Sequence, residues 1–275
     1  MILIVYSVLD IAGINIAQQI LKHYAFTASP KLYKTSPLYT ADVNGHPTVL
    51  VALKEEAVCA QYLQDDFPDA DLIVFISRHT SQSGKPTLTV HTPGNFGAAE
   101  FGGYPKIVSV APAVAMQTAL KALDHYRRHL SLSGYQVSYE CTHHGPSLNV
   151  PAMFVELGSS PAQWSDSRAA EAVAHSALTA VGTFTNTGVS AVLGIGGTHY
   201  NEKFTTMALM DTALFGHMIP KYAVSAIDSS MIRQCVERTF ENVPLALLDW
   251  KGISSKDKPS LLSALEQASL PYQKI

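Results

Sequence analysis

Short runs of residues that are apolar at every position recur along this chain, and they limit the possible folds more than any other feature. Three of these runs cover residues 2–6, 49–53 and 72–76. Strands that are apolar throughout are typical of sheets covered on both faces by helices. Because segments with a helical spacing of apolar residues lie between such runs, the sequence predicts a three-layer α/β/α fold around a mixed central sheet.

The order of the remaining elements follows from apolar spacing and from residues that start or stop helices. One helix is expected after Asp10. Further strands are expected at residues 107–110, 135–139, 152–157, 189–195 and 245–248, and further helices at 112–129, 160–182, 228–240 and 259–268. No linker-like stretch divides the chain, so residues 1–275 are expected to form a single domain.

The composition fits a well-buried core and argues against several classes of protein. Of the 275 residues, 47% are apolar and 15% are charged, which disfavours long disordered segments. The net charge of −3 gives no general attraction to nucleic acid, so phosphate contacts would need a local group of cations. Three scattered cysteines, and the lack of an apolar run near the roughly 20 residues of a membrane span, predict a cytoplasmic protein without membrane contact.

Histidines follow several of the predicted strands, and this repetition indicates a functional site. His79, His91 and His199 lie at or just after three strands, and the pair His143 and His144 follows a fourth. Loops at strand ends often carry the active sites of α/β folds. A single histidine in a loop is usually a hydrogen-bonded structural group, but five imidazoles in such loops are better satisfied by one shared ion.

The residue types in these loops suit zinc. Imidazole nitrogen and carboxylate oxygen are ligands that zinc prefers, and a catalytic zinc site keeps one position for water. The five histidines, with Glu140 and Glu156, supply more donors than such a site needs. A His-Glu-x-x-His helix is absent, so the ligands would have to come from separate loops.

Five blocks of sequence occur in the order of a known family. They cover residues 77–81, 88–91 with 94–95, 140–147, 156–159 with 163–164, and 194–200. The most specific are His-His-Gly-Pro-Ser at 143–147 and Gly-Ile-Gly-Gly-Thr-His-Tyr at 194–200. From residue 1 to beyond residue 222 the chain resembles the archaeal and plant type of D-aminoacyl-tRNA deacylase. The resemblance implies a cytosolic, zinc-dependent esterase that removes D-amino acids from tRNA, on a phosphorylase/hydrolase-like fold related to peptidyl-tRNA hydrolase.

The resemblance also implies catalytic roles. Glu140 or Glu156 would orient the attacking water or pass its proton to the leaving ribose oxygen. For Glu156, a structural role at a strand end is an equal alternative. The family continues after residue 200 with a short basic stretch, whereas this chain has Asn-Glu-Lys at 201–203. Lys203 therefore keeps a cation that would act in catalysis, although the acid before it departs from the family pattern.

Glycine-rich loops supply candidate substrate contacts. The turn that contains Gly196 and Gly197 lacks the features of a dinucleotide or phosphate loop, so its expected use is close backbone approach to a phosphate or an oxyanion. Gly94 and Asn95 would hold the amino group or the terminal adenosine. In both places a simple turn without a ligand is the alternative. Further substrate contacts are expected from Ser147, His217 and Lys221.

The sequence is also compatible with other functions. The same broad fold serves nucleoside phosphorylases and zinc aminopeptidase-like hydrolases, and a fold does not fix a function. A phosphorylase needs an anion pocket rich in arginine, but Arg78 is the only arginine in the loops named above. A non-catalytic RNA- or metal-binding protein is a further alternative. The expected partner is D-aminoacyl-tRNA as substrate, with no obligate protein partner.

Overall fold

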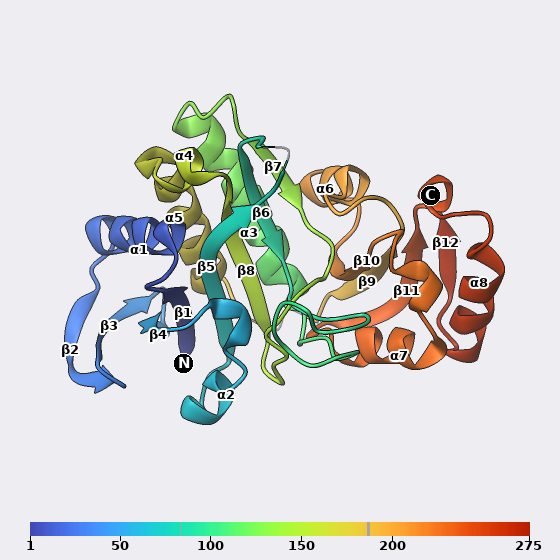
Figure 1. The fold of residues 1–275 in the computed structure, drawn as a ribbon, viewed down its shortest axis with the longest axis horizontal. Coiled ribbons are helices and arrows are strands. Elements are labelled where there is room, and N and C mark those ends of the chain that lie inside the picture. Colours follow the sequence, from blue (N-terminus) through green and yellow to red (C-terminus); the bar gives the residue numbers. More distant parts are fainter. Residues whose placement is uncertain (83, 186–187) are drawn as a thin grey trace.

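An eight-stranded mixed sheet forms the larger part of the fold (Figure 1). The computed structural model describes residues 1–82, 84–185 and 188–275. The strands of this sheet are β1 (Ile2–Ser7), β2 (Thr27–Tyr33), β3 (Ser36–Val43), β4 (His46–Leu53), β5 (Leu72–Thr80), β6 (Thr87–His91), β7 (Gln136–Tyr139) and β8 (Ala152–Ser159). They lie in the order β2-β3-β4-β1-β5-β8-β6-β7. The predicted mixed α/β architecture is therefore confirmed.

Both faces of this sheet are covered, as predicted from the apolar runs. The helices on one face are α1 (Ile11–His23), α3 (Ala113–His129) and α5 (Ser167–Gly182). Ile4 of β1 packs toward these helices, whereas its neighbour Val5 packs toward the short helices η1 (Ala57–Cys59) and α2 (Leu63–Asp66) on the other face. Because side chains alternate along a strand, a strand buried on both faces must be apolar at every position.

Four more strands form a second, parallel sheet, where the sequence had predicted one sheet only. They are β9 (Ser190–Ile195), β10 (Phe215–Ile219), β11 (Asn242–Leu248) and β12 (Tyr272–Lys274), in the order β10-β9-β11-β12. The helices α6 (Glu202–Leu209), α7 (Ser229–Glu237) and α8 (Lys258–Gln267) accompany this sheet (Figure 1). The two sheets are not continuous. After β7 ends at Tyr139, the chain forms isolated backbone hydrogen bonds to β10, such as the one from Thr142 N–H to the Met218 carbonyl at 2.9 Å.

Several local predictions were wrong or incomplete. The sequence reading missed β2 and β3, which are mostly exposed and carry no clear alternation. Residues 107–110 form isolated bridges instead of a strand. The helix predicted at 160–182 is two helices, α4 (Pro161–Trp164) and α5, because the Asp166 side chain accepts backbone hydrogen bonds at the start of α5. Among the described residues, no helix is long and apolar enough to cross a membrane.

Candidate active site

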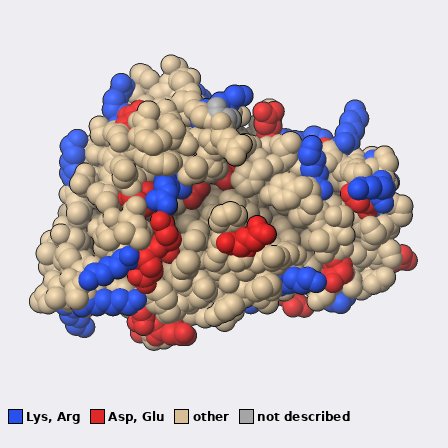
Figure 2. Space-filling view, in the orientation of Figure 1, with Lys and Arg blue, Asp and Glu red and all other residues tan. Residues whose placement is uncertain are grey.

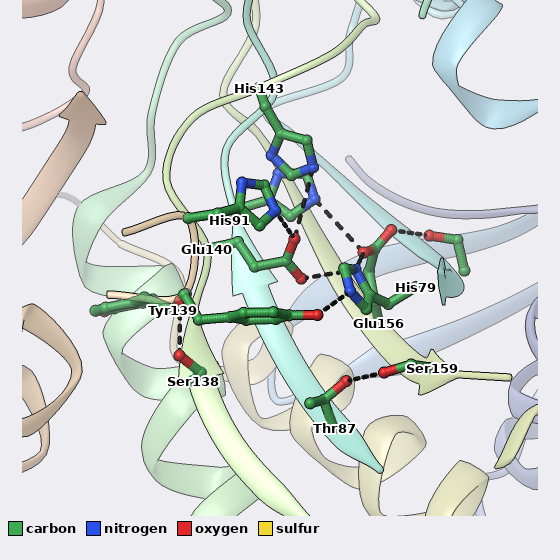
Figure 3. Close-up of polar contacts among 12 residues, drawn as sticks. His79, Thr87, His91, Ser138, Tyr139, Glu140, His143, Glu156 and Ser159 are labelled. Atoms are coloured by element: carbon green, nitrogen blue, oxygen red, sulfur yellow. Dashed lines mark hydrogen bonds and ion pairs between the residues drawn. The ribbon is translucent and has the colours of Figure 1, made fainter. Parts of the chain in front are cut away.

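Alternation along the central strands directs four polar side chains to one face of the large sheet. Ser77 and His79 belong to β5, Glu156 to β8 and His91 to β6. Ser77 lies opposite Glu156 in the register of β5 and β8. The neighbouring residues Ile76, Val90 and Val155 pack into the helical layer, so the polar side chains beside them point away from it and toward one another (Figure 3).

The segment that follows β7 completes the cluster. The backbone N–H of Cys141 donates to the His199 carbonyl at 2.9 Å, which joins this segment to the glycine-rich turn after β9. His144 has a φ of 42°, in the left-handed region. This turn lets both adjacent imidazoles reach the same place, and the ring centroids of His143 and His144 lie 4.3 Å apart. The structure thus brings all five predicted histidines together with Glu140 and Glu156.

Backbone carbonyls fix the same tautomer in three imidazoles of the cluster. The Nδ1 atoms of His91, His143 and His144 face the carbonyl oxygens of Thr92, Cys141 and Gly145 at 3.3, 2.9 and 2.6 Å. A carbonyl oxygen can only accept, so each Nδ1 carries the hydrogen and each neutral ring keeps a lone pair on Nε2. One ligand atom from each of these rings lies within 4.8 Å of the other two. Metal-binding histidines are commonly oriented in this way.

Two buried carboxylates share the imidazole of His79. Its Nδ1 atom lies 3.0 Å from Glu140 Oε1 and 3.4 Å from Glu156 Oε2. The hydroxyl of Ser77 donates to Glu156 Oε1 at 2.7 Å. His199 Nε2 lies 2.8 Å from Glu140 Oε2. Both carboxylates are therefore fixed in position by neighbouring side chains.

The charges of these three groups support one another. Burial acts to lower the pKa of His79, but Glu140 and Glu156 outweigh this effect and raise the pKa to about 11. Burial acts to raise the pKa of Glu156, but the imidazoles of His79 and His91, with ring nitrogens 3.4 and 3.7 Å from Oε2, lower it to about 2. In Glu140 the charge of His79 likewise overcomes burial and holds the pKa well below its usual range. At neutral pH an imidazolium therefore lies between two carboxylates, and the trio has a net negative charge.

The other imidazoles suit a cation. Burial, assisted by the charge of His144, holds the pKa of His143 well below its usual range. Burial lowers the pKa of His144 to about 4. Burial also acts to lower the pKa of His91, but the nearby carboxylate of Glu156, with Oε2 3.7 Å from Nε2, raises it overall. The negative field that favours a proton on His91 would equally favour a metal cation there.

One polar atom of the cluster supports this interpretation. His91 Nε2 is buried and has no hydrogen-bond partner among the described residues, since Glu156 Oε2 lies 3.7 Å away. A buried polar atom without a partner is costly, and a cation bound to Nε2 would satisfy it. Within this cluster, the sets of residues close enough to share an ion are His91 with His143 and His144, Glu140 with His143 and His199, and His79 with Glu140 and Glu156, while His23, Glu171 and His175 form a further set elsewhere. Histidine and carboxylate ligands of this kind fit zinc.

A cavity of about 540 Å³ opens onto this cluster. The buried side chains of Phe154 and Glu156 form part of its wall, together with the exposed ring of Phe101. Arg78 and Glu56 also line the cavity and form an ion pair at 2.9 Å. Figure 2 shows that Lys and Arg side chains on this face are dispersed and not gathered into one broad patch.

Lys203 and Lys221 lie outside this cavity. Lys203 Nζ contacts Asp249 Oδ1 at 2.5 Å, and both lysines line a separate hollow of about 270 Å³. Gly196 and Gly197, with φ values of 110° and 77°, form a tight turn beside this hollow, and their contact with substrate stays a prediction. The structure does not bring Lys203 to the histidine cluster, since its partner is an aspartate at the end of β11.

Four other residues predicted to contact substrate make structural contacts and are not among those that line the cavity: Gly94, Asn95, Ser147 and His217. The N–H of Gly94 donates to the His144 carbonyl at 2.7 Å. Asn95 and Ser147 form hydrogen bonds to the loop at 102–107. His217 is completely buried, and its Nε2 lies within hydrogen-bond distance of two backbone carbonyls. These residues support the segment that carries the histidines.

Sequence reasoning missed three residues at the site. Ser77 lies two positions before His79 on the same strand, so alternation could have identified it. Tyr200 contacts His79 Nε2 through its hydroxyl, and it directly follows a predicted ligand. Phe101 lies in a loop without regular structure, and no local pattern connects that loop to the cavity.

Comparisons with known proteins agree with this geometry. Residues 66–273 match a family described as "D-aminoacyl-tRNA deacylase". The chain is 32% identical over 269 residues to the D-aminoacyl-tRNA deacylase of Thermococcus kodakarensis, and 32% over 271 residues to that of Pyrococcus abyssi, with 96% of each chain covered in both cases. A crystal structure titled as a conserved protein of unknown function, AF0625, aligns with a TM-score of 0.88 at 29% identity, covering 100% of this chain and 95% of the other.

Proposed function

The chain belongs to the D-aminoacyl-tRNA deacylases, hydrolases that act on the aminoacyl-tRNA ester bond, and we propose that its buried histidine and glutamate cluster is the zinc-dependent catalytic site. The ester cleaved would be the one between a D-amino acid and the 3′-terminal ribose. We also propose that residues 1–275 act as one catalytic domain, in the cytoplasm, where aminoacyl-tRNA is made and used.

One observation carries the zinc proposal. His91, His143 and His144 each give their Nδ1 hydrogen to a backbone carbonyl, which leaves three Nε2 lone pairs in close proximity. Three imidazoles with room for a fourth ligand are typical of catalytic zinc sites. When bound, zinc lowers the pKa of a coordinated water to about 7 and so supplies a nucleophile at neutral pH.

We propose different roles for the two carboxylates. Glu140 is ionised and accepts a hydrogen bond from His199 at 2.8 Å, so it can take a proton from the attacking water. The imidazole of His199 is 30% exposed, and we propose that the Glu140–His199 pair passes the proton to the leaving ribose oxygen. Glu156 is held by Ser77 and His79, and its proposed role is to fix both His79 and His91.

Lys203 has no part in this proposal, since it is paired with Asp249 beyond the cavity. The cation inside the cluster is His79. As an imidazolium it would keep both carboxylates ionised without supplying a proton at neutral pH, because its pKa is about 11. Burial acts against this charge, and the two glutamates outweigh that effect.

The test compares D-tyrosyl-tRNA with L-tyrosyl-tRNA in the presence and absence of a chelator. We expect rapid release of D-tyrosine, slow release of L-tyrosine, loss of activity after chelation and recovery on adding zinc. Equal rates for the two substrates would contradict the chiral selectivity. Full activity in protein shown by elemental analysis to be free of metal would contradict the role of zinc.

A further inference from the structure

We propose that Phe101 is a stacking platform for the adenine of the 3′-terminal adenosine of the substrate. The proposal rests on the function proposed above, and it identifies the part of aminoacyl-tRNA that occupies the mouth of the cavity. Phe101 is 71% exposed, although aromatic side chains usually bury most of their surface. It lines the same cavity as His143, His144 and His199.

The backbone holds Phe101 in a fixed position. Its carbonyl oxygen accepts the N–H of Gly145 at 2.9 Å, so its loop is bonded directly to the segment that carries His143 and His144. Gly102 has a φ of 74°, and a Cβ there would clash with the Val58 carbonyl. Because the backbone is already fixed, stacking of a ligand would need to order only the ring itself.

The chemistry of the substrate limits where its base can lie. The ester carbonyl must reach the imidazole cluster, and adenine is attached to the same ribose as the ester. The base must therefore lie near the mouth of the cavity, a few covalent bonds from the reacting carbon. Phe101 is the exposed aromatic residue among those that line this cavity.

The charges around the cavity favour this orientation. Glu56 and Arg78 form an ion pair there, with Asp10 close to the guanidinium. A carboxylate such as that of Glu56 suits the α-ammonium group of the amino acid, whereas the uncharged π face of Phe101 suits a base. Since every substrate tRNA ends in the same adenosine, stacking would provide affinity that does not depend on the amino acid.

The experiment uses two esters of D-tyrosine, one with adenosine and one with methyl riboside, which lacks the base. In Phe101→Ala we expect kcat/KM for the adenosine ester to fall by roughly 5- to 150-fold, mainly through KM, because this is the usual effect of removing one stacked aromatic. The methyl riboside ester should be cleaved equally by both proteins. Phe101→Trp should retain the wild-type value for the adenosine ester.

The matched control is Tyr104→Ala, which removes another exposed aromatic from the same loop but not from the cavity wall. It should behave as wild type on both esters. An equal loss on both esters in Phe101→Ala would overturn the proposal, because the ring would then contact the amino acid or shape the site. Unchanged kinetics on both would overturn it as well.

A binding measurement separates this proposal from the proposed function. Adenosine alone is titrated into wild type and Phe101→Ala by isothermal calorimetry. Weaker binding to the variant by the same factor supports the stacking platform, even if neither ester is cleaved and the deacylase assignment of the site fails. Equal binding, or no binding to either protein, rejects the platform.

Discussion

His199 Nε2 lies 2.8 Å from Glu140 Oε2, so a partly exposed imidazole is hydrogen-bonded to a carboxylate that is completely buried. The pair extends from the inside of the cluster toward solvent. In the proposed mechanism, a proton taken up by Glu140 would therefore reach the leaving group without crossing open water.

Replacing Glu140 by Gln should abolish this transfer. We expect kcat on D-aminoacyl-tRNA to fall by about 100-fold or more, since general acid–base catalysis contributes about 10²–10⁴-fold. Single-turnover rates measure the chemical step directly. Glu171→Gln is the matched control, because Glu171 pairs with His23 and His175 on distant helices. A kcat within a few-fold of wild type in Glu140→Gln would remove Glu140 from catalysis.

Replacing His143 or His144 by Ala should lower the zinc content. Each variant loses one of three Nε2 donors, so we expect less than one zinc per chain by elemental analysis, together with loss of activity. His125→Ala is the control, since His125 is exposed on α3. Thermal unfolding of the metal-free proteins should shift only modestly. Collapse of the fold would instead assign these residues a structural role.

The stability of the protein should fall as the pH drops below about 6.5. Burial lowers the pKa of His217 to about 4, against about 6.5 in an unfolded chain. Between these values only the unfolded state takes up the proton, so folding loses on the order of 3 kcal/mol from this group by pH 4, and nothing above pH 6.5. The cause is structural, because Nδ1 must stay unprotonated to accept from Thr142.

Urea unfolding at pH 7 and pH 5 measures this effect. His217→Gln should show a smaller difference in the free energy of unfolding between the two pH values than wild type, whatever its stability at pH 7. An identical difference would mean that His217 is not responsible. Comparison within metal-free proteins removes the contribution of proton uptake by zinc ligands.

Replacing Lys203 by Ala should leave kcat/KM within about twofold of wild type. Its ion pair with Asp249 is partly exposed, and such pairs contribute about 0–1 kcal/mol to stability. Activity and urea unfolding are measured side by side, with Asp249→Ala as the partner variant. A 100-fold loss of activity in the lysine variant alone would restore the catalytic role predicted from sequence.

The sequence identified the donor atoms of the site but not their arrangement. His79 and His91 could be predicted because each lies at the end of an apolar run, and strand ends meet at edges of sheets. The tautomers of His91, His143 and His144 could not, since they depend on carbonyl oxygens fixed only by the folded backbone. Lys203 was predicted from family position, while its true partner is 46 residues away.

In the fold, too, local patterns could be predicted from sequence and long-range contacts could not. Buried strands such as β1 and β5 were predictable because burial on both faces requires apolar residues throughout. The separation of β9 to β12 into a second sheet was not, because strand order depends on contacts between segments far apart in the chain. The exposed strands β2 and β3 gave no apolar pattern to detect.

The bonds from Cys141 to His199 and from Thr142 to Met218 run between the two sheets. Hydrolysis should therefore depend on correct packing of the second sheet (β9 to β12) against the large sheet. A small displacement of the second sheet would move His199 away from Glu140 and stop hydrolysis while most helices remain intact. On gradual heating, inactivation should precede the loss of far-ultraviolet circular dichroism.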